Sequence, residues 1–182
     1  MPNWCGNQAV LTFPSKELHD LFLNSVSDAN IFSTFAPLNL GEDENGSSRW
    51  EFSKAIEVWG TKCEPLDVVV IESSEQPDEN WRVRVSFDTA WAPPIGVYER
   101  LNKNHGILVK AYFHESGEEV FGMCTYDGDV ENNKYYNYPR SAPQLFSLRE
   151  CIGINGELDV YMFSEWTRLE TRWSEHNSDD SF

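Results

Sequence analysis

Basic residues are scarce in this chain. It has 14 lysines and arginines against 30 aspartates and glutamates, and its formal net charge is −16. Binding to nucleic-acid phosphates or to an anionic membrane needs clustered Lys and Arg, which displace counterions. The composition therefore argues against direct contact with nucleic acid or membranes and favours a basic protein surface as the partner. High solubility alone is the other explanation of such a charge.

The sequence also lacks long apolar runs and the pattern of a secretory signal peptide. No stretch approaches the length of a membrane span. Met1 is followed by neither a basic end nor an apolar core, so we expect no signal peptide. No Cys-x-x-Cys spacing occurs among the four cysteines, which are Cys5, Cys63, Cys124 and Cys151. We therefore expect a cytoplasmic protein with reduced, mostly buried thiols.

The sequence has no recognisable catalytic or cofactor motif. There is no glycine-rich dinucleotide or Walker-type loop, and no spacing typical of a zinc site. None of the histidines lies beside a Ser or Cys nucleophile. Cys5 could be reactive next to Trp4, but a buried structural role is favoured. We expect no cofactor and no metal, and an enzyme is the less favoured interpretation.

One acidic stretch resembles the start of a calcium loop. Asp127, Asp129 and Glu131 alternate along it. The loop's sixth position, which needs glycine, is Asn132, and its twelfth, which needs a bidentate glutamate, is Tyr138. A solvated acidic turn is therefore the favoured interpretation.

Hydrophobic patterns predict strands and helices in the first part of the chain. Gln8–Phe13 is typical of a strand, and Ser15 is placed to cap a following helix. Arg49–Trp59 is ambiguous between helix and strand. Leu66–Ser73 is β-branched throughout its centre and predicts a buried strand, whereas Trp81–Ala90 alternates and predicts a half-buried one.

A second helix and a hairpin are predicted next. Pro93 and Pro94 favour a helical start, and Gly106 ends the helix. Ile107–Glu115 and Glu119–Gly128 predict a β-hairpin, with a further edge strand after it. The element order predicts an α+β fold, a ferredoxin-like split βαβ two-layer sandwich with a β-hairpin extension.

The end of the chain has a different pattern. One helical face is predicted by residues spaced four, four, three and four apart, namely Leu158, Met162, Trp166, Leu169 and Trp173. The sequence thus predicts a ferredoxin-like domain over 1–138, a C-terminal helical extension packed on it over 139–174, and an acidic tail over 175–182. A partner-docking role for the extension is the alternative.

Four short motifs occur together, and their order and spacing matter more than any one alone. They are PNWCGN (Pro2–Asn7), WGTKC (Trp59–Cys63), FDTAWAPP (Phe87–Pro94) and GEEVFGM (Gly117–Met123). Over Met1–Tyr138 the chain resembles the YubB-like family, ferredoxin-like proteins of plasmids and phages with unknown function. Cys63 stands where the resemblance leads us to expect a second tryptophan. The resemblance implies a bacterial host and suggests interference with host defence, and it brings no catalytic assignment.

Two functional hypotheses follow. In the first, the protein is non-enzymatic and occupies the basic, nucleic-acid-binding surface of a host defence complex. Its partner-binding acids would be Glu42, Asp43, Glu44, Glu115, Glu118, Glu119, Asp127, Asp129 and Glu131.

In the second hypothesis, the protein binds a small ligand or is an enzyme, with a pocket formed by Asn3, Trp4, Asn7, Trp59, Lys62, Asp88 and Trp91. The alternative for this second set is a scaffold that ties strand ends together. The oligomeric state stays open.

Trp91 is the most distinctive residue of the second set. The alternation of Val83, Val85, Phe87 and Thr89 predicts that Trp91 caps the buried face as the strand leaves the sheet. On that interpretation, Trp91→Ala would lower the free energy of unfolding by roughly 3–5 kcal/mol.

Overall fold

The computed structural model describes residues 3–41, 51–75, 80–115, 117–118 and 120–137. The described elements belong to a compact unit, Met1–Tyr136, apart from the last residue of the final strand; a second unit spans Asn137–Phe182. The predicted C-terminal helix and acidic tail lie outside the described residues, as does Cys151. The predicted boundaries at 138 and 174 therefore stay predictions.

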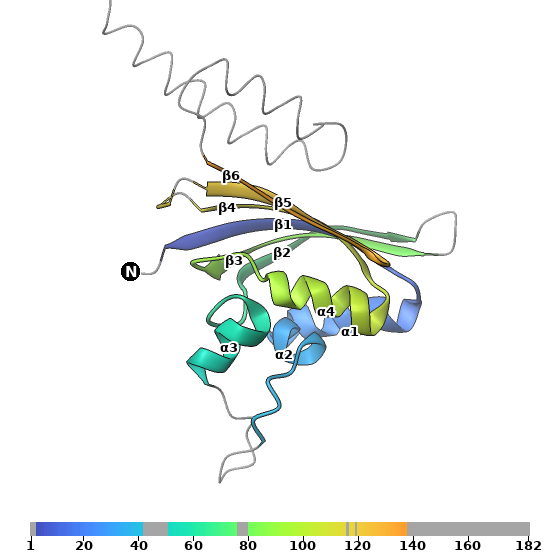
Figure 1. Ribbon diagram of the computed structural model, residues 1–182. Coiled ribbons are helices and arrows are strands. Elements are labelled where there is room, and N and C mark those ends of the chain that lie inside the picture. Colours follow the sequence, from blue (N-terminus) through green and yellow to red (C-terminus); the bar gives the residue numbers. More distant parts are fainter. Residues whose placement is uncertain (1–2, 42–50, 76–79, 116, 119, 138–182) are drawn as a thin grey trace, which may run out of the picture. The chain divides into compact units, whose positions relative to one another are not determined.

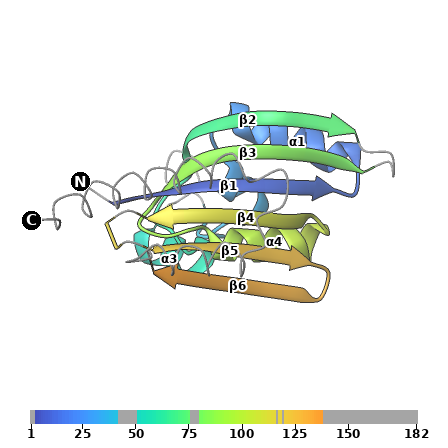
Figure 2. The same ribbon diagram turned by 90° about the horizontal axis from the view of Figure 1, so that it is seen from above.

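A six-stranded sheet forms the centre of the unit, in the order β2-β3-β1-β4-β5-β6 (Figure 2). Its strands are β1 (Trp4–Phe13), β2 (Leu66–Glu75), β3 (Trp81–Ala90), β4 (Leu108–Glu115), β5 (Val120–Asp127) and β6 (Val130–Asn137). β1 pairs antiparallel with both β3 and β4, β2 with β3, and β4 with β5. The first segment of the chain thus lies inside the sheet, between strands that come much later in the sequence.

The helices of the described part lie on one face of this sheet (Figure 1). They are α1 (Lys16–Ser27), α2 (Ile31–Phe35), α3 (Phe52–Trp59) and α4 (Ile95–His105). Successive side chains of a strand point to opposite faces, so every second residue of β1 meets the helices. Those residues are Cys5, Asn7, Ala9, Leu11 and Phe13; all are buried, and the four apolar ones belong to the core.

The predicted start of the helix after β1 is confirmed, as are the predicted start and end of the helix after β3. Ser15 caps α1 because its hydroxyl oxygen accepts a hydrogen bond from the Leu18 amide at 3.4 Å. α4 begins directly after Pro93 and Pro94. It ends at Gly106, whose φ of 66° lies in the left-handed region that glycine adopts without strain.

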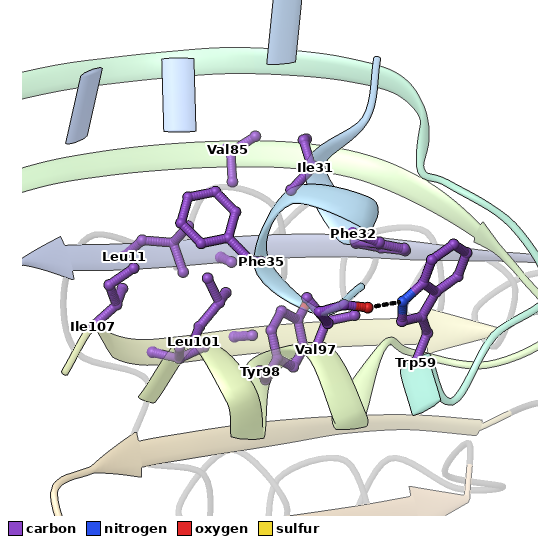
Figure 3. Close-up of a cluster of buried hydrophobic side chains, with 14 of the residues drawn as sticks. Leu11, Ile31, Phe32, Phe35, Trp59, Val85, Val97, Tyr98, Leu101 and Ile107 are labelled. Carbon is purple, nitrogen blue, oxygen red and sulfur yellow. Dashed lines mark hydrogen bonds between the residues drawn. The ribbon is translucent and has the colours of Figure 1, made fainter. Parts of the chain in front are cut away.

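Aromatic rings fill the space between helices and sheet (Figure 3). Trp59, at the end of α3, is 1% exposed, and its ring centroid lies 5.6 Å from that of Phe32. The Trp59 indole N–H donates to the Ala36 carbonyl oxygen at 2.6 Å, the bond drawn in Figure 3. This bond satisfies the polar atom of the ring, so the whole indole can be buried at little cost.

Two predictions for the middle of the chain need revision. The ambiguous stretch Arg49–Trp59 contains the helix α3, which ends at Gly60 with φ 84°. β2 is a strand as predicted, but its predicted burial is wrong: Val69 and Ile71 are 55% and 47% exposed. The physical reason is that β2 is an edge strand with only one face on the core: Val68 and Val70 pack against the core, whereas Val69 and Ile71 point to the other face. A β-branched run marks a strand but does not say how many neighbours the strand has.

The prediction that Trp91 caps the buried face of the sheet is also wrong. The alternation of β3 holds as far as Thr89, which is fully buried, but Trp91 is 56% exposed. Its φ is 74°, in the left-handed region. β3 ends at Ala90, and the change of backbone conformation at the next residue turns the indole toward solvent. Trp91 therefore does not cap the buried face.

The two tryptophans should differ sharply in their effect on stability. We expect Trp59→Ala to lower the free energy of unfolding by about 3–5 kcal/mol, because it empties a core site. We expect Trp91→Ala to change it by less than about 1 kcal/mol, since most of the indole already contacts water. Urea unfolding of both variants measures this difference. Equal losses for the two variants would contradict the exposed position of Trp91.

Candidate functional site

The residues predicted to form a pocket divide into a buried pair and a set at one end of the sheet. Asn7 and Trp59 are buried in the interior, whereas Asn3, Trp4 and Trp91 are exposed. The interior pair belongs to the scaffold, and the exposed residues gather at one end of the sheet, where β1 begins and β3 ends. Lys62 and Asp88, both half-buried, lie at that end as well.

The interior residues tie β1 to the end of β3. The Asn7 amide donates to the Cys5 carbonyl oxygen at 2.8 Å and to the Thr89 hydroxyl oxygen at 2.9 Å. The Thr89 hydroxyl in turn lies 2.8 Å from the Ala92 carbonyl oxygen and donates to it. Thr61, which follows α3, donates to the Ala90 carbonyl oxygen at 2.8 Å. Three of the sequence motifs thus converge on one network of side-chain-to-backbone bonds, which is a scaffold role.

The thiols of Cys5 and Cys124 are buried in the core. Burial raises the pKa of Cys5 and of Cys124 to about 12, so both stay protonated at neutral pH. The predicted structural role of Cys5 is therefore confirmed. Cys63 is half-buried, and burial, followed by the nearby Glu64 carboxylate, raises its pKa as well. In the described part of the chain all the cysteines are free.

Within the described residues, no group of three or more His, Cys, Asp or Glu side chains could hold a metal ion. None of the described helices is long and apolar enough to cross a membrane.

One predicted partner-binding acid is an internal residue. Glu115 is 5% exposed, although it lies in an acidic stretch. Its carboxylate accepts hydrogen bonds from the backbone amides of Gly117 at 2.8 Å and Glu118 at 2.6 Å. Glu115 therefore closes the connection between β4 and β5, and the prediction that it contacts a partner is wrong. A carboxylate at a tight turn finds backbone donors nearby, which the sequence pattern alone did not reveal.

Other acids of the first hypothesis are on the surface. Asp127, Asp129 and Glu131 are exposed at the turn between β5 and β6, and Glu118 is exposed at the turn before β5. The exposure of Asp127, Asp129 and Glu131 agrees with the interpretation of this stretch as a solvated turn. Outside the described residues lie Glu42, Asp43, Glu44 and Glu119.

The Lys62 ammonium contacts the rings of the exposed Trp91 and of the exposed Phe52 in α3. We call these three residues, together with the exposed Ile56 one turn further along α3 and the exposed Leu66 opposite Asp88, the Trp91 surface. The Lys62 ammonium lies 2.6 Å from the Trp91 ring centroid and 5.1 Å from that of Phe52. This cation therefore links the β3–α4 corner to α3.

The sequence prediction included Lys62 and Trp91 but missed their apolar neighbours. Phe52 and Ile56 are four residues apart in α3 and both are exposed, whereas Ala55, Val58 and Trp59 of the same helix are buried. An apolar stripe that is wider than the contact with the core leaves the residues at its margin exposed. The pattern was present in the sequence, but it could be recognised only once the stretch was known to be a helix.

Two carboxylates lie at the same end of the sheet. Asp88 pairs with Leu66 across β2 and β3, and Asp67 follows Leu66. The pKa of Asp88 is raised, chiefly because the carboxyl group is partly buried and then because the Asp67 charge is near; His114 acts in the opposite direction. The proximity of two acids increases the negative charge at this end of the sheet.

Comparison with known proteins supports the fold prediction. Residues 72–142, less than half of the chain, match the family model described as the ferredoxin-like domain in Api92-like protein. The matched range begins within β2 and includes α4 and β3 to β6. The prediction of a ferredoxin-like domain is thus confirmed for this part of the chain.

The chain also aligns with the crystal structure of a protein api92 from Yersinia pseudotuberculosis. The identity is 14% and the TM-score is 0.39, over 58% of this chain and 37% of that one. The chain therefore spans well under half of that protein's length. No curated protein sequence matches the chain.

The raised pKa of Asp88 has a consequence for stability. An acid whose pKa is higher in the folded state holds its proton more tightly there, so its ionisation opposes folding. This cost is absent below the ordinary pKa of 3.8 and is fully present above the raised value. We therefore expect Asp88→Asn to raise the melting temperature at about pH 7 and to have almost no effect near pH 3. Calorimetry at both pH values, with the exposed Asp129→Asn as control, measures this. An equal gain at the two pH values would contradict it.

Proposed function

We propose that the protein is a non-enzymatic interaction protein whose partner presents a basic surface. The observation that carries the proposal is the net charge of −16. Several described lysines are paired with acids of their own helices, namely Lys16 with Asp20, Lys54 with Glu57 and Lys103 with Glu99. Such pairing cancels local positive charge, while the turn between β5 and β6 presents three exposed acids, of which Glu131 lies 3.9 Å from Lys103.

A surface that binds nucleic acid is the partner that fits best. It carries Lys and Arg arranged for phosphates, and a protein with a large negative potential is attracted to the same groups. Occupation of that surface by this protein would exclude the nucleic acid. Charge complementarity of this kind governs the rate of encounter and the choice of partner more than the final affinity.

We further propose that the chain belongs to a YubB-like group of plasmid or phage proteins and acts in the cytoplasm of the bacterial host. The joint presence of four motifs supports this, as does the way three of them meet at the start of β1 and the end of β3. A mobile element gains from blocking host defence, so the proposed target is a defence complex that binds nucleic acid.

The finer fold assignment is also a proposal. The strand order β2-β3-β1-β4, with helices on one face, is what a split βαβ sandwich requires. In this assignment β1-α1-β2 and β3-α4-β4 are the two halves, α2 and α3 are insertions before β2, and β5 and β6 form the hairpin extension.

The proposed function predicts salt-sensitive capture of basic proteins. Immobilised protein is incubated with bacterial lysate at about 0.1 M and about 0.5 M salt, with and without heparin as a polyanionic competitor. We expect the retained proteins to be basic and to be released by high salt and by heparin. Capture of only neutral or acidic proteins, unaffected by salt, would overturn the proposal.

Matched charge variants sharpen the same experiment. Neutralisation of the β5–β6 turn by Asp127→Asn, Asp129→Asn and Glu131→Gln should reduce the captured amount about fivefold or more. A control removes the same charge from α1, its C-cap and α3 by Glu17→Gln, Asp28→Asn and Glu57→Gln. We expect this control to have less than about a twofold effect. Equal losses for the two variants would show that net charge, and not the turn, determines capture.

A further inference from the structure

The exposed position of Trp91 is maintained against a conformational cost. A bulky residue with φ 74° is rare, because its Cβ crowds the backbone. The neighbouring bonds hold it there: the Trp91 amide donates to the Asn3 carbonyl oxygen at 2.9 Å, and the Thr89 hydroxyl donates to the Ala92 carbonyl oxygen at 2.8 Å. Strain that the surroundings enforce is typical of functional sites. Here its result is an indole that faces solvent.

The face of this indole already carries a cation. The Lys62 ammonium lies over the Trp91 ring, so the ring acts as a cation–π acceptor. The position is not ideal for lysine, since an ammonium is strongly hydrated and loses water against the rings. Partial burial lowers the pKa of Lys62, which is consistent with this loss of hydration.

The surroundings suit an arginine better than the lysine that is present. A guanidinium is planar and weakly hydrated, and it stacks on aromatic faces more favourably than an ammonium does. Asp67 and Asp88 add negative charge at the same end of the sheet. Exposed Phe52 and Ile56 can contact apolar side chains next to such an arginine. Tryptophan on one partner and arginine on the other are also the residues most enriched in interface hot spots.

We propose that the Trp91 surface is the anchor of the partner interface, and that an arginine of a basic protein partner stacks on Trp91 in place of Lys62. This inference rests on the proposed function, because it specifies how the basic partner is recognised. The acidic turns then steer the encounter, whereas the Trp91 surface holds the complex together. Lys62 acts as an internal placeholder that covers the ring until the partner arrives.

An oligo-arginine peptide tests the proposal directly, with an oligo-lysine peptide of equal length as comparison. Calorimetric titration measures the affinity, and the indole N–H resonance of Trp91, identified by its absence in Trp91→Phe, reports the contact. We expect the arginine peptide to shift this resonance and to bind more tightly than the lysine peptide. Absence of binding by the arginine peptide, or equal binding of both peptides, would overturn the proposal.

Variants separate the ring from general charge attraction. Trp91→Ala should weaken binding of the arginine peptide about tenfold, whereas Trp91→Phe should retain most of it. Tyr135→Ala removes an aromatic side chain with the same exposed fraction, 56%, and should change the affinity by less than about twofold. Thermal melts verify that each variant is folded, and Trp91→Phe keeps the test valid if the alanine variant is not.

Removal of the placeholder gives the most specific result. Lys62→Ala should raise the affinity for the arginine peptide about fivefold or more, because the ring is then vacant. Lys16→Ala removes the same charge from α1, where Lys16 is paired with Asp20, and should raise it by less than about twofold. Equal gains in the two variants would show that only net charge matters, and would overturn the proposal.

The outcomes also distinguish this inference from the proposed function. Suppose that peptide binding survives Trp91→Ala but is lost when Asp127, Asp129 and Glu131 are neutralised. The anchor is then wrong, and the acidic protein still binds basic partners. If instead the lysate experiment retains no basic protein while the peptide binds at Trp91, the anchor exists and the proposed function fails.

Discussion

The pairing of β1 with β3 is the interaction on which the rest of the structure depends. It places Trp4 opposite Ala90 and Asn7 opposite Phe87, residues that are 86 and 80 positions apart in the chain. A shift of the register by one residue would turn every side chain of β1 to the other face of the sheet. The Asn7–Thr89 hydrogen bond opposes such a shift, since a buried amide without its partner costs about 1–3 kcal/mol.

The pairing of β1 with β3 also positions the residues at the end of the sheet. Because the start of β1 lies beside the end of β3, the Asn3 carbonyl oxygen is positioned to hold the Trp91 amide. Thr61 bonds to the Ala90 carbonyl oxygen and brings the segment after α3 to the same place, together with Lys62. The scaffold bonds are therefore inside and the tryptophan is outside. Residues that looked like one cluster in the sequence have two different roles.

The acidic residues likewise have two different roles. Some acids serve the fold: Glu115 closes a turn, and Glu64 accepts hydrogen bonds from the backbone amides of Phe32 and Ser33, each at 2.7 Å, near the start of α2. Others, at the β5–β6 turn, remain on the surface. An acid at a turn or a helix start has backbone amides within reach, and that local geometry decides whether its charge is available to a partner.

The amino-acid sequence determined the features that depend on near neighbours along the chain. The caps at Ser15 and Gly106, the alternation of β3 and the hairpin strands β4 and β5 follow from local periodicity and turn chemistry, and they were predictable. The net charge, which carries the proposed function, is likewise a property of composition. Three features required the tertiary structure: the edge position of β2, the internal role of Glu115 and the exposure of Trp91. Each depends on what lies beside the residue in space, because burial is decided by neighbouring strands and by backbone conformation at strand ends, neither of which local periodicity encodes.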